Sequence, residues 1–365
     1  MTVEVDDPQT SREPQRQATV AVIIPVHNGE SLLAETVESA FAQSFSDIEV
    51  LVVDDASTDQ TPELLASLEE RFAPRLRWWR LPQNIGPSAA RNFAFEKTRA
   101  PLVAPLDGDD LWHVDKLRLL VEALDRRPDA VVAYSSVAHI DGESRFMYEA
   151  SRASHDGDVF LQILLGNFLE CGSNPLVRAD AWRAVGGYDA TLRTGDDWDF
   201  YLKLADRGPF AAVPETLTLY RKHPGSATAR SLVAMEQGGR RVARRHGAKL
   251  SGPARALRRP MMANLYRYFL QQVYEGPPAA WRGPAGLRFT VQLLRFDPEL
   301  RRSTAALLLL KAVIWLLSGR RADRAEGIVV RLTGLEQLRG VHFRPTEDIT
   351  TELPEDVANA VVSRF

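Results

Sequence analysis

Three short clusters of acidic residues are the parts of this chain best suited to chemistry. They are Asp54-Asp55, Asp107-Gly108-Asp109-Asp110, and Asp196-Asp197 with Asp199. Crowded carboxylates repel one another unless a cation lies among them, and hard divalent cations prefer carboxylate oxygens. An Asp-x-Asp turn can place one carboxylate on a metal and another on a ribose hydroxyl. Each cluster taken alone is also compatible with a solvated turn or a helix cap.

The third cluster and one histidine add further chemical possibilities. Gly195-Asp196-Asp197-Trp198-Asp199 opens a predicted helix, where a carboxylate is stabilised as the anion. Such a carboxylate could act as the general base for an attacking hydroxyl group. Tyr220-Arg221-Lys222-His223 ends a predicted strand, and His223 could complete a metal site, although a lone histidine more often has a structural role.

The elements that must position these clusters alternate between strands and helices. Strands are predicted at Val20–Ile24, Ile48–Val53, Leu76–Arg80, Leu102–Leu106, Ala130–Val137 and Ala211–Leu219. Helices are predicted over 32–41, 62–72, 88–97, 114–125, 158–165, 179–185 and 198–206. This order predicts an α/β fold with a mostly parallel sheet flanked by helices. Ligands bind outside the carboxyl ends of such strands, so Pro25-Val26-His27-Asn28, Asp54-Asp55 and Asp107–Asp110 are expected to meet at one rim.

Residues 230–345 differ from the preceding part in pattern and charge. Their pattern is almost wholly helical. They are rich in arginine, whereas acidic residues predominate in residues 1–229, and the net charge of the whole chain is -3. A basic region suits phospholipid head groups or a phosphorylated acceptor, although arginines can also simply solvate helix faces. The apolar stretch Thr304–Leu317 is shorter than the ~20 residues of a spanning helix. It is compatible with a membrane-interface helix or with a core helix.

Composition and cysteine usage bound the class of protein. The chain is 45% hydrophobic and 25% charged, which is enough to form a sizeable core. The single cysteine, Cys171, excludes a disulfide within the chain and favours a cytoplasmic setting, with peripheral contact at the inner membrane face left open. Residues 1–17 lack the pattern of a signal peptide and are predicted to be a disordered leader, and residues 346–365 form an acidic tail.

Taken in chain order, the motifs resemble the inverting glycosyltransferase family 2, which has the GT-A fold. The resemblance spans about residues 18–226. Its motifs are Val22-Ile23-Ile24-Pro25-Val26-His27-Asn28, Val53-Asp54-Asp55-Ala56-Ser57-Thr58-Asp59, Asn84-Ile85-Gly86 with Ala90-Arg91-Asn92, Asp107-Gly108-Asp109-Asp110, Gly186-Gly187-Tyr188-Asp189, Gly195-Asp196-Asp197-Trp198-Asp199 and Tyr220-Arg221-Lys222-His223. Each motif is weak alone, but seven in the family's order are difficult to obtain by chance.

The resemblance implies a role for each matching residue. The residues implied around the donor nucleotide are Pro25, His27, Asn28, Asp54, Asp55, Arg91 and Asp107. Asp109 and His223 match the ligands of a Mn²⁺ or Mg²⁺ ion, and Asp197 matches the catalytic base. Two positions depart from the family's usual residues. His27 stands where tyrosine is frequent, and Asp196 stands where glutamate is frequent, so Asp196 remains the alternative base.

The resemblance implies a metal-dependent inverting glycosyltransferase. A GT-A domain over 18–229 would transfer a sugar from a nucleotide-diphosphate donor, expected to be UDP-linked. The acceptor would be a hydroxyl of a glycan, a lipid carrier or a small molecule, with no nucleic acid partner, and a homo-oligomer remains open. A sugar nucleotidyltransferase would need a Gly-rich basic loop after the first strand, where Pro25-Val26-His27-Asn28-Gly29 stands. A non-catalytic nucleotide-sugar binding module would be expected to lose the base or the metal ligands, which are present.

Overall fold

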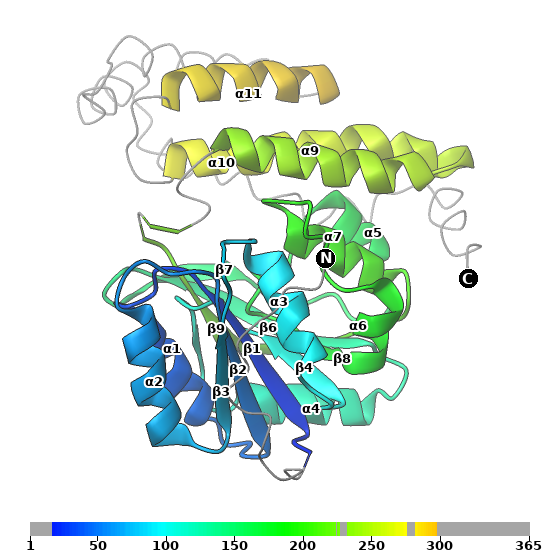
Figure 1. Ribbon diagram of the computed structural model, residues 1–365. Helices are drawn as coiled ribbons and strands as arrows, with labels where there is room; N and C mark the ends of the chain where they lie inside the picture. Colours follow the sequence, from blue (N-terminus) through cyan, green and yellow to red (C-terminus); the bar gives the residue numbers. More distant parts are fainter. Residues whose placement is uncertain (1–16, 224, 227–231, 276–281, 298–365) are drawn as a thin grey trace. The chain divides into compact units, whose positions relative to one another are not determined.

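The computed structural model describes residues 17–223, 225–226, 232–275 and 282–297. The chain divides into two compact units, which are described separately: residues 1–163 with 167–223, and residues 164–166 with 224–365 (Figure 1). The leader before residue 17, the acidic tail and the apolar stretch over 304–317 lie outside the described residues.

The first unit is built on one mixed sheet of nine described strands. Their order is β3-β2-β1-β4-β8-β6-β9-β5, and β7 pairs with β6. The strands are β1 (Val20–Val26), β2 (Ile48–Asp54), β3 (Leu76–Arg80), β4 (Leu102–Pro105), β5 (Leu111–Trp112), β6 (Val132–Ile140), β7 (Phe146–Ser151), β8 (Leu176–Arg178) and β9 (Phe210–Arg221).

The prediction of a mostly parallel sheet is correct for one part of the sheet, and the other part is largely antiparallel. Strands β3, β2, β1 and β4 are mutually parallel, and β9 is parallel to β6. Four further pairings are antiparallel: β4 with β8, β8 with β6, β6 with β7, and β5 with β9. The sequence did not predict β5, β7 or β8. Strands of two or three residues show no periodicity, and the exposed Phe146 and Tyr148 of β7 break the pattern of buried apolar strands.

Helices flank the sheet of the first unit. They are α1 (Leu33–Phe41), α2 (Thr61–Phe72), α3 (Pro87–Glu96), α4 (Lys116–Arg126), α5 (Phe160–Leu165), α6 (Ala179–Val185) and α7 (Asp196–Ala205). Every helix predicted up to residue 206 is therefore present, with ends shifted by no more than two residues. α5 crosses the boundary between the two units, since residues 164–166 group with the second.

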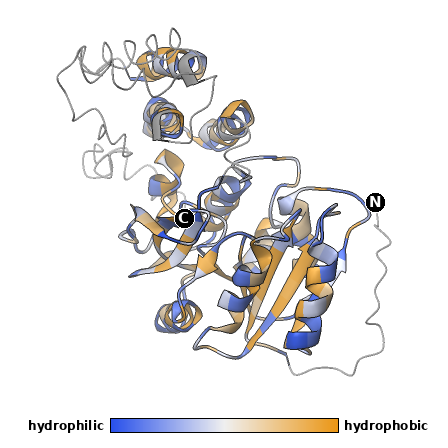
Figure 2. Cartoon of the chain, turned by 90° about the vertical axis from the view of Figure 1, so that its left-hand side faces the viewer, coloured by the Kyte–Doolittle hydropathy of each residue, from blue (hydrophilic) through white to orange (hydrophobic). Residues whose placement is uncertain are grey.

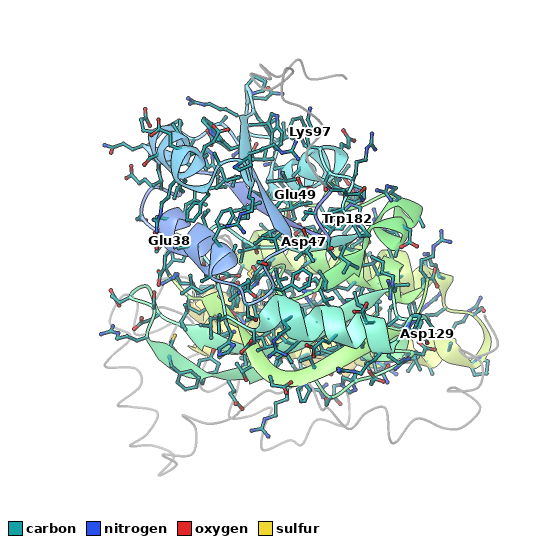
Figure 3. All side chains as sticks on the ribbon, turned by 90° about the horizontal axis from the view of Figure 1, so that it is seen from below. Glu38, Asp47, Glu49, Lys97, Asp129 and Trp182 are labelled. Atoms are coloured by element: carbon teal, nitrogen blue, oxygen red, sulfur yellow. The ribbon has the colours of Figure 1, made fainter. Side chains whose placement is uncertain are left out.

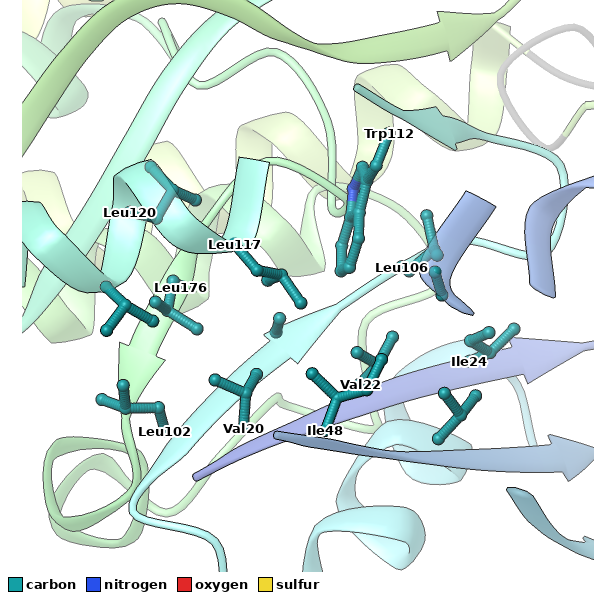
Figure 4. Close-up of a cluster of buried hydrophobic side chains, with 14 of the residues drawn as sticks. Val20, Val22, Ile24, Ile48, Leu102, Leu106, Trp112, Leu117, Leu120 and Leu176 are labelled. Atoms are coloured by element: carbon teal, nitrogen blue, oxygen red, sulfur yellow. The ribbon is translucent and has the colours of Figure 1, made fainter. Parts of the chain in front are cut away.

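Burial on both faces of β1 fixes the position of its carboxyl end. Val20, Val22 and Ile24 belong to a cluster of buried apolar side chains that also includes Leu117 and Leu120 of α4 (Figure 4). The alternate residues of β1 are fully buried as well, and α3 packs against this strand. Each such side chain contributes about 1.5–3 kcal/mol on burial. The strand and the loop that follows it are therefore held firmly.

Coloured by hydropathy, the strands of the sheet are mostly hydrophobic, while the helices that flank it carry both hydrophilic and hydrophobic residues (Figure 2). Glu38 of α1 and Asp129 after α4, labelled in Figure 3, have side chains that are 47% and 60% exposed. This distribution follows from the amphipathic pattern of helices that cover a sheet.

The second unit is helical in its described part. It contains α9 (Leu232–Lys249), the 3₁₀ helix η1 (Gly252–Leu257), α10 (Arg258–Glu275) and α11 (Arg282–Phe296). Tyr266 and Phe269 of α10 pack with Phe289 of α11, with ring centroids 5.3–6.0 Å apart. The buried Glu236 of α9 accepts a hydrogen bond from the Tyr266 hydroxyl and pairs with Arg288. In the part of the chain that the structure describes, no helix is long and apolar enough to cross a membrane.

Candidate functional site

Three loops meet at the carboxyl ends of β1, β2 and β4. The Asp55 amide donates to the Val26 carbonyl at 2.8 Å, and the Leu106 amide donates to the Ile23 carbonyl at 2.9 Å. The Asn28 amide donates to the Ser57 hydroxyl at 2.8 Å. The structure therefore brings together the segments that were expected to share one rim, and it does so through main-chain contacts that parallel strands impose.

The two aspartates at the end of β2 are engaged in different ways. Both carboxylate oxygens of Asp55 accept amide hydrogen bonds, from Ile85 at 2.7 Å and Gly86 at 2.8 Å. Asp54 is fully buried, and its Oδ1 accepts the Ser57 amide at 2.9 Å. Asp54 Oδ2 has no hydrogen-bond partner within the described residues, but Arg80 Nε lies 3.4 Å from it as an ion pair. The Asp55 carboxylate therefore holds the loop before α3 in place, while Asp54 Oδ2 still has hydrogen-bonding capacity for a ligand.

His27 and Pro25 lie on the same rim as these aspartates. His27 Nδ1 is 2.8 Å from the Asp55 carbonyl oxygen, which fixes the imidazole beside the β2 loop. Pro25 is paired with Val53 in the parallel register of β1 and β2. The side-chain oxygen of Asn28 accepts the Thr58 amide at 2.8 Å. Each of these residues therefore lies beside the Asp54-Asp55 turn.

Arg91 connects two of the acidic clusters. Its guanidinium is buried on α3 and pairs with both Asp107 and Asp196, the latter at 3.2 Å. Ser88, one helical turn before Arg91, donates to Asp196 Oδ2 at 2.6 Å. Burial raises the pKa of Asp107 despite the opposing charge of Arg91. Both Asp107 and Asp196 are therefore held by a cation that belongs to the protein.

Asp109 and Asp110 have opposite environments. Asp110 is fully buried and accepts hydrogen bonds from the Ser173 hydroxyl at 2.5 Å and the Arg221 amide at 2.9 Å. Burial, with the charge of Asp109, raises the pKa of Asp110 well above its usual value. Asp109 has a side chain 28% exposed, and its Oδ2 is 2.9 Å from His223 Nε2. Asp110 stabilises the turn, while Asp109 and His223 face outward together.

The pair of Asp109 and His223 fits a divalent cation that shares its ligands with a substrate. Within the described residues, no group of three or more acidic, histidine or cysteine side chains could hold a metal ion. Mg²⁺ commonly takes only one or two protein ligands and completes its shell with substrate phosphates and water, and Mn²⁺ accepts carboxylate and imidazole ligands. One carboxylate and one imidazole suit that arrangement, so these two residues would hold the ion jointly with a diphosphate.

Asp197, at the start of α7, differs from its neighbour Asp196. Its Oδ2 accepts a hydrogen bond from Asn167 Nδ2 at 3.0 Å, and its Oδ1 accepts the Trp198 amide at 2.8 Å. No protein cation pairs with Asp197 among the described residues, whereas Asp196 is paired with Arg91. Burial, and secondly the charge of Asp196, raises the pKa of Asp197 to about 7. A carboxylate of that pKa can accept a proton near neutrality.

Two buried basic side chains beneath the site were not identified from the sequence. Lys116 of α4 is fully buried and donates to the Asn174 carbonyl at 2.6 Å and to the Thr218 hydroxyl at 2.7 Å. Arg221 is also fully buried, and its Nε donates to the Asp109 carbonyl at 2.6 Å. Lys116 follows the acidic turn by six residues in a helical pattern that predicts a surface lysine. Only three-dimensional packing shows that it lies under the site.

Comparisons with known proteins agree on one family. The model described as "Glycosyl transferase family 2" matches residues 21–184. The succinoglycan biosynthesis protein ExoO of Rhizobium meliloti is 33% identical over 57% of this chain and 62% of its own length. Chondroitin synthase of Escherichia coli is 29% identical over 54% of this chain and 28% of its own length. The chain therefore spans less than two thirds of the length of these relatives.

Two solved structures share the fold. The mannosyltransferase PcManGT of Pyrobaculum calidifontis, in complex with GDP-Man and Mn²⁺, superimposes with a TM-score of 0.54 over 91% of this chain and 92% of its own, at 18% identity. TarS of S. aureus, residues 1–349 in complex with UDP, gives a TM-score of 0.53 over 88% of this chain and 91% of its own, also at 18% identity. Both similarities support the GT-A fold.

Proposed function

We propose that the chain is a family 2 glycosyltransferase, the family whose model it matches over residues 21–184, and that it transfers a sugar from a nucleotide-diphosphate donor to a hydroxyl acceptor, with a divalent metal and with inversion. The observation that supports the proposal most strongly is that the carboxylates of Asp196 and Asp197 have different partners. Arg91 and Ser88 bind Asp196, whereas the donors to Asp197 among the described residues are the neutral Asn167 side chain and the Trp198 amide, and burial raises the pKa of Asp197 to about 7. We therefore assign the catalytic base to Asp197.

The donor would bind along the rim from Asp54 to His223. Asp54 Oδ2, which is ion-paired with Arg80 but accepts no hydrogen bond within the described residues, suits an N–H of a nucleobase, and Asp107 suits a ribose hydroxyl. Asp109 and His223 would hold Mn²⁺ or Mg²⁺, which neutralises charge on a departing diphosphate. TarS has been crystallised with UDP and with UDP-GlcNAc, and PcManGT with GDP-Man and Mn²⁺. We propose a UDP-linked donor for this chain.

In the proposed reaction, the hydroxyl oxygen of the acceptor attacks the anomeric carbon. Asp197 accepts the proton of that hydroxyl in the same step. The bond from that carbon to the diphosphate oxygen breaks in the same step, so the anomeric configuration inverts. The Asn167 amide stabilises the ionised carboxylate before attack. Arg91 pairs with Asp107 and with Asp196, which leaves Asp197 as the carboxylate at the start of α7 without a cationic partner among the described residues, and we assign the proton to it.

The test is turnover of a panel of nucleotide sugars, measured as nucleotide release with Mn²⁺ and with a chelator. Asp197→Asn is expected to lower kcat by about 10²–10⁴-fold while leaving donor binding within a few-fold. Asp125→Asn, at an exposed position of α4, is the matched control. Near-normal turnover in Asp197→Asn would refute the assignment of the base. Binding without turnover in the wild type would instead indicate a non-catalytic module, and retained anomeric configuration in the product by NMR would refute inversion.

A further inference from the structure

Glu170 has an unusual environment in the loop between α5 and β8. Its backbone has φ of 68°, in the left-handed region that favours glycine. The carboxylate is partly buried, and it makes no hydrogen bond or ion pair with any residue that the structure describes. A strained backbone and an unpaired, partly desolvated carboxylate both cost free energy. Such a combination persists where a ligand uses the group.

The loop that carries Glu170 contacts both ends of the proposed site. On one side, Asn167 donates to Asp197. On the other side, Gly172 lies so close to the donor residues that a Cβ there would be 3.1 Å from both Arg91 Nη2 and Asp107 Oδ2. Glu170 stands between Asn167 and Gly172 in the sequence of this loop. The Tyr201 hydroxyl donates to the Cys171 carbonyl at 2.8 Å and anchors the peptide that follows Glu170.

The electrostatics of Glu170 agree with this intermediate position. Burial raises the pKa of its carboxyl to about 7; the positive charge of Lys222 opposes the shift, and the negative charge of Asp197 adds to it. Lys222 precedes His223, the proposed metal ligand, and Asp197 is the proposed base. The Glu170 carboxyl therefore interacts electrostatically both with Lys222, next to the proposed metal ligand, and with Asp197, the proposed base. A hydrogen-bond donor that arrives there would relieve the cost of its burial.

A transferred sugar must occupy the same region. Its anomeric carbon is attacked by the oxygen held at Asp197 and is bonded to the diphosphate held at Asp109 and His223. We propose that Glu170 is a specificity-determining residue, which accepts a hydrogen bond from a hydroxyl group of the transferred sugar. This role rests on the proposed function. It requires that the sugar of the donor has a hydroxyl group that faces the loop of residues 167–174.

The test compares the affinities of nucleotides and nucleotide sugars. Wild type, Glu170→Gly and Glu170→Gln are titrated by calorimetry, in the presence of Mn²⁺, with UDP, UDP-GlcNAc, GDP and GDP-mannose. For Glu170→Gly, the ratio of nucleotide-sugar affinity to nucleotide affinity is expected to fall about 10- to 100-fold for the pair that the wild type binds. Glu170→Gln retains an acceptor oxygen, so a smaller fall is expected. Glu215→Gln, at an exposed position on β9, is the control.

A thermal melt separates this role from a structural one. Glycine adopts the left-handed conformation without a Cβ clash, so Glu170→Gly is expected to keep or raise the melting temperature while it loses sugar affinity. An unchanged affinity ratio, or equal losses for nucleotide and nucleotide sugar, would overturn the role of Glu170. A wild type that binds none of the four compounds would contradict the proposed function itself, which is a different result.

Discussion

The Asn167 amide offers a direct way to shift the pKa of the proposed base. Its Nδ2 donates to Asp197 Oδ2 at 3.0 Å, and this bond stabilises the ionised form of the carboxylate. Replacement of Asn167 by alanine removes the bond and leaves the carboxylate in place. A hydrogen bond to a charged group contributes about 1.5–3 kcal/mol, and a pKa unit corresponds to about 1.4 kcal/mol. The pKa of Asp197 is therefore expected to rise by about 1–2 units from about 7.

The shift has a defined sign in the rate. Asp197 must be unprotonated to accept a proton, so kcat/KM of the wild type is expected to rise with pH through about 7 and then reach a plateau. In Asn167→Ala the same rise moves to about pH 8–9. At pH 7 the unprotonated fraction falls from about one half to about one tenth or less, so the rate falls at least about 5-fold and recovers in alkaline buffer.

The assay is a pH profile of kcat/KM from nucleotide release, for wild type, Asn167→Ala and the exposed amide control Gln83→Ala. A loss of rate that is equal at every pH, with the inflection unmoved, would refute the reasoning. Asn167 would then act on the shape of the loop and not on the ionisation of Asp197. A profile of Gln83→Ala that matches the wild type would show that removal of a surface amide has no effect.

Two further predictions concern the residues around the acidic turn. Burial lowers the pKa of Lys116 to about 7, so above that pH the amine takes up a proton when the protein unfolds. The free energy of unfolding therefore rises with pH. Relative to Lys116→Met, the free energy of unfolding of the wild type, measured by urea denaturation, should increase by about 1.5–2 kcal/mol between pH 7 and pH 8.5. A difference that does not vary with pH would contradict the burial of a neutral amine. Gly172→Ala places a Cβ 3.1 Å from Arg91 and Asp107, so nucleotide affinity should fall several-fold in calorimetry and stability by about 1 kcal/mol. Unchanged affinity for both UDP and GDP would show that the Arg91–Asp107 pair is remote from the nucleotide.

The elements of the first unit could be predicted because their signals are local. Short apolar runs followed by Pro or Asp predicted β1, β2 and β4, and helical spacing of apolar residues predicted α1 to α4. The rule that ligands bind at strand ends then placed Asp54, Asp107 and Asp109 on one rim. Short strands such as β5 and β8 carry no such signal, because two or three residues cannot show a period.

The partners of the acidic residues could not be predicted, because they depend on contacts between distant parts of the chain. Arg91 and Asp196 are separated by 105 positions, and His223 and Asp109 by 114. Family likeness left two candidates for the base, and our proposal of Asp197 depends on the pairing of Arg91 with Asp196. The left-handed backbone at Glu170 also left no trace in the sequence, since the residue there is neither glycine nor asparagine.

Each carboxylate of the acidic turn has a partner supplied by the protein: Arg91 for Asp107, His223 for Asp109, and the Ser173 hydroxyl for Asp110. A turn whose carboxylates all have hydrogen-bond or ion-pair partners within the protein does not need an ion for assembly, unlike small domains that fold only when zinc is bound. The apo protein should therefore survive dialysis against a chelator as a native, monodisperse species. A metal ion that binds tightly only together with the donor diphosphate would exchange with solvent between turnovers. The metal and the donor would therefore bind cooperatively, each raising the affinity for the other.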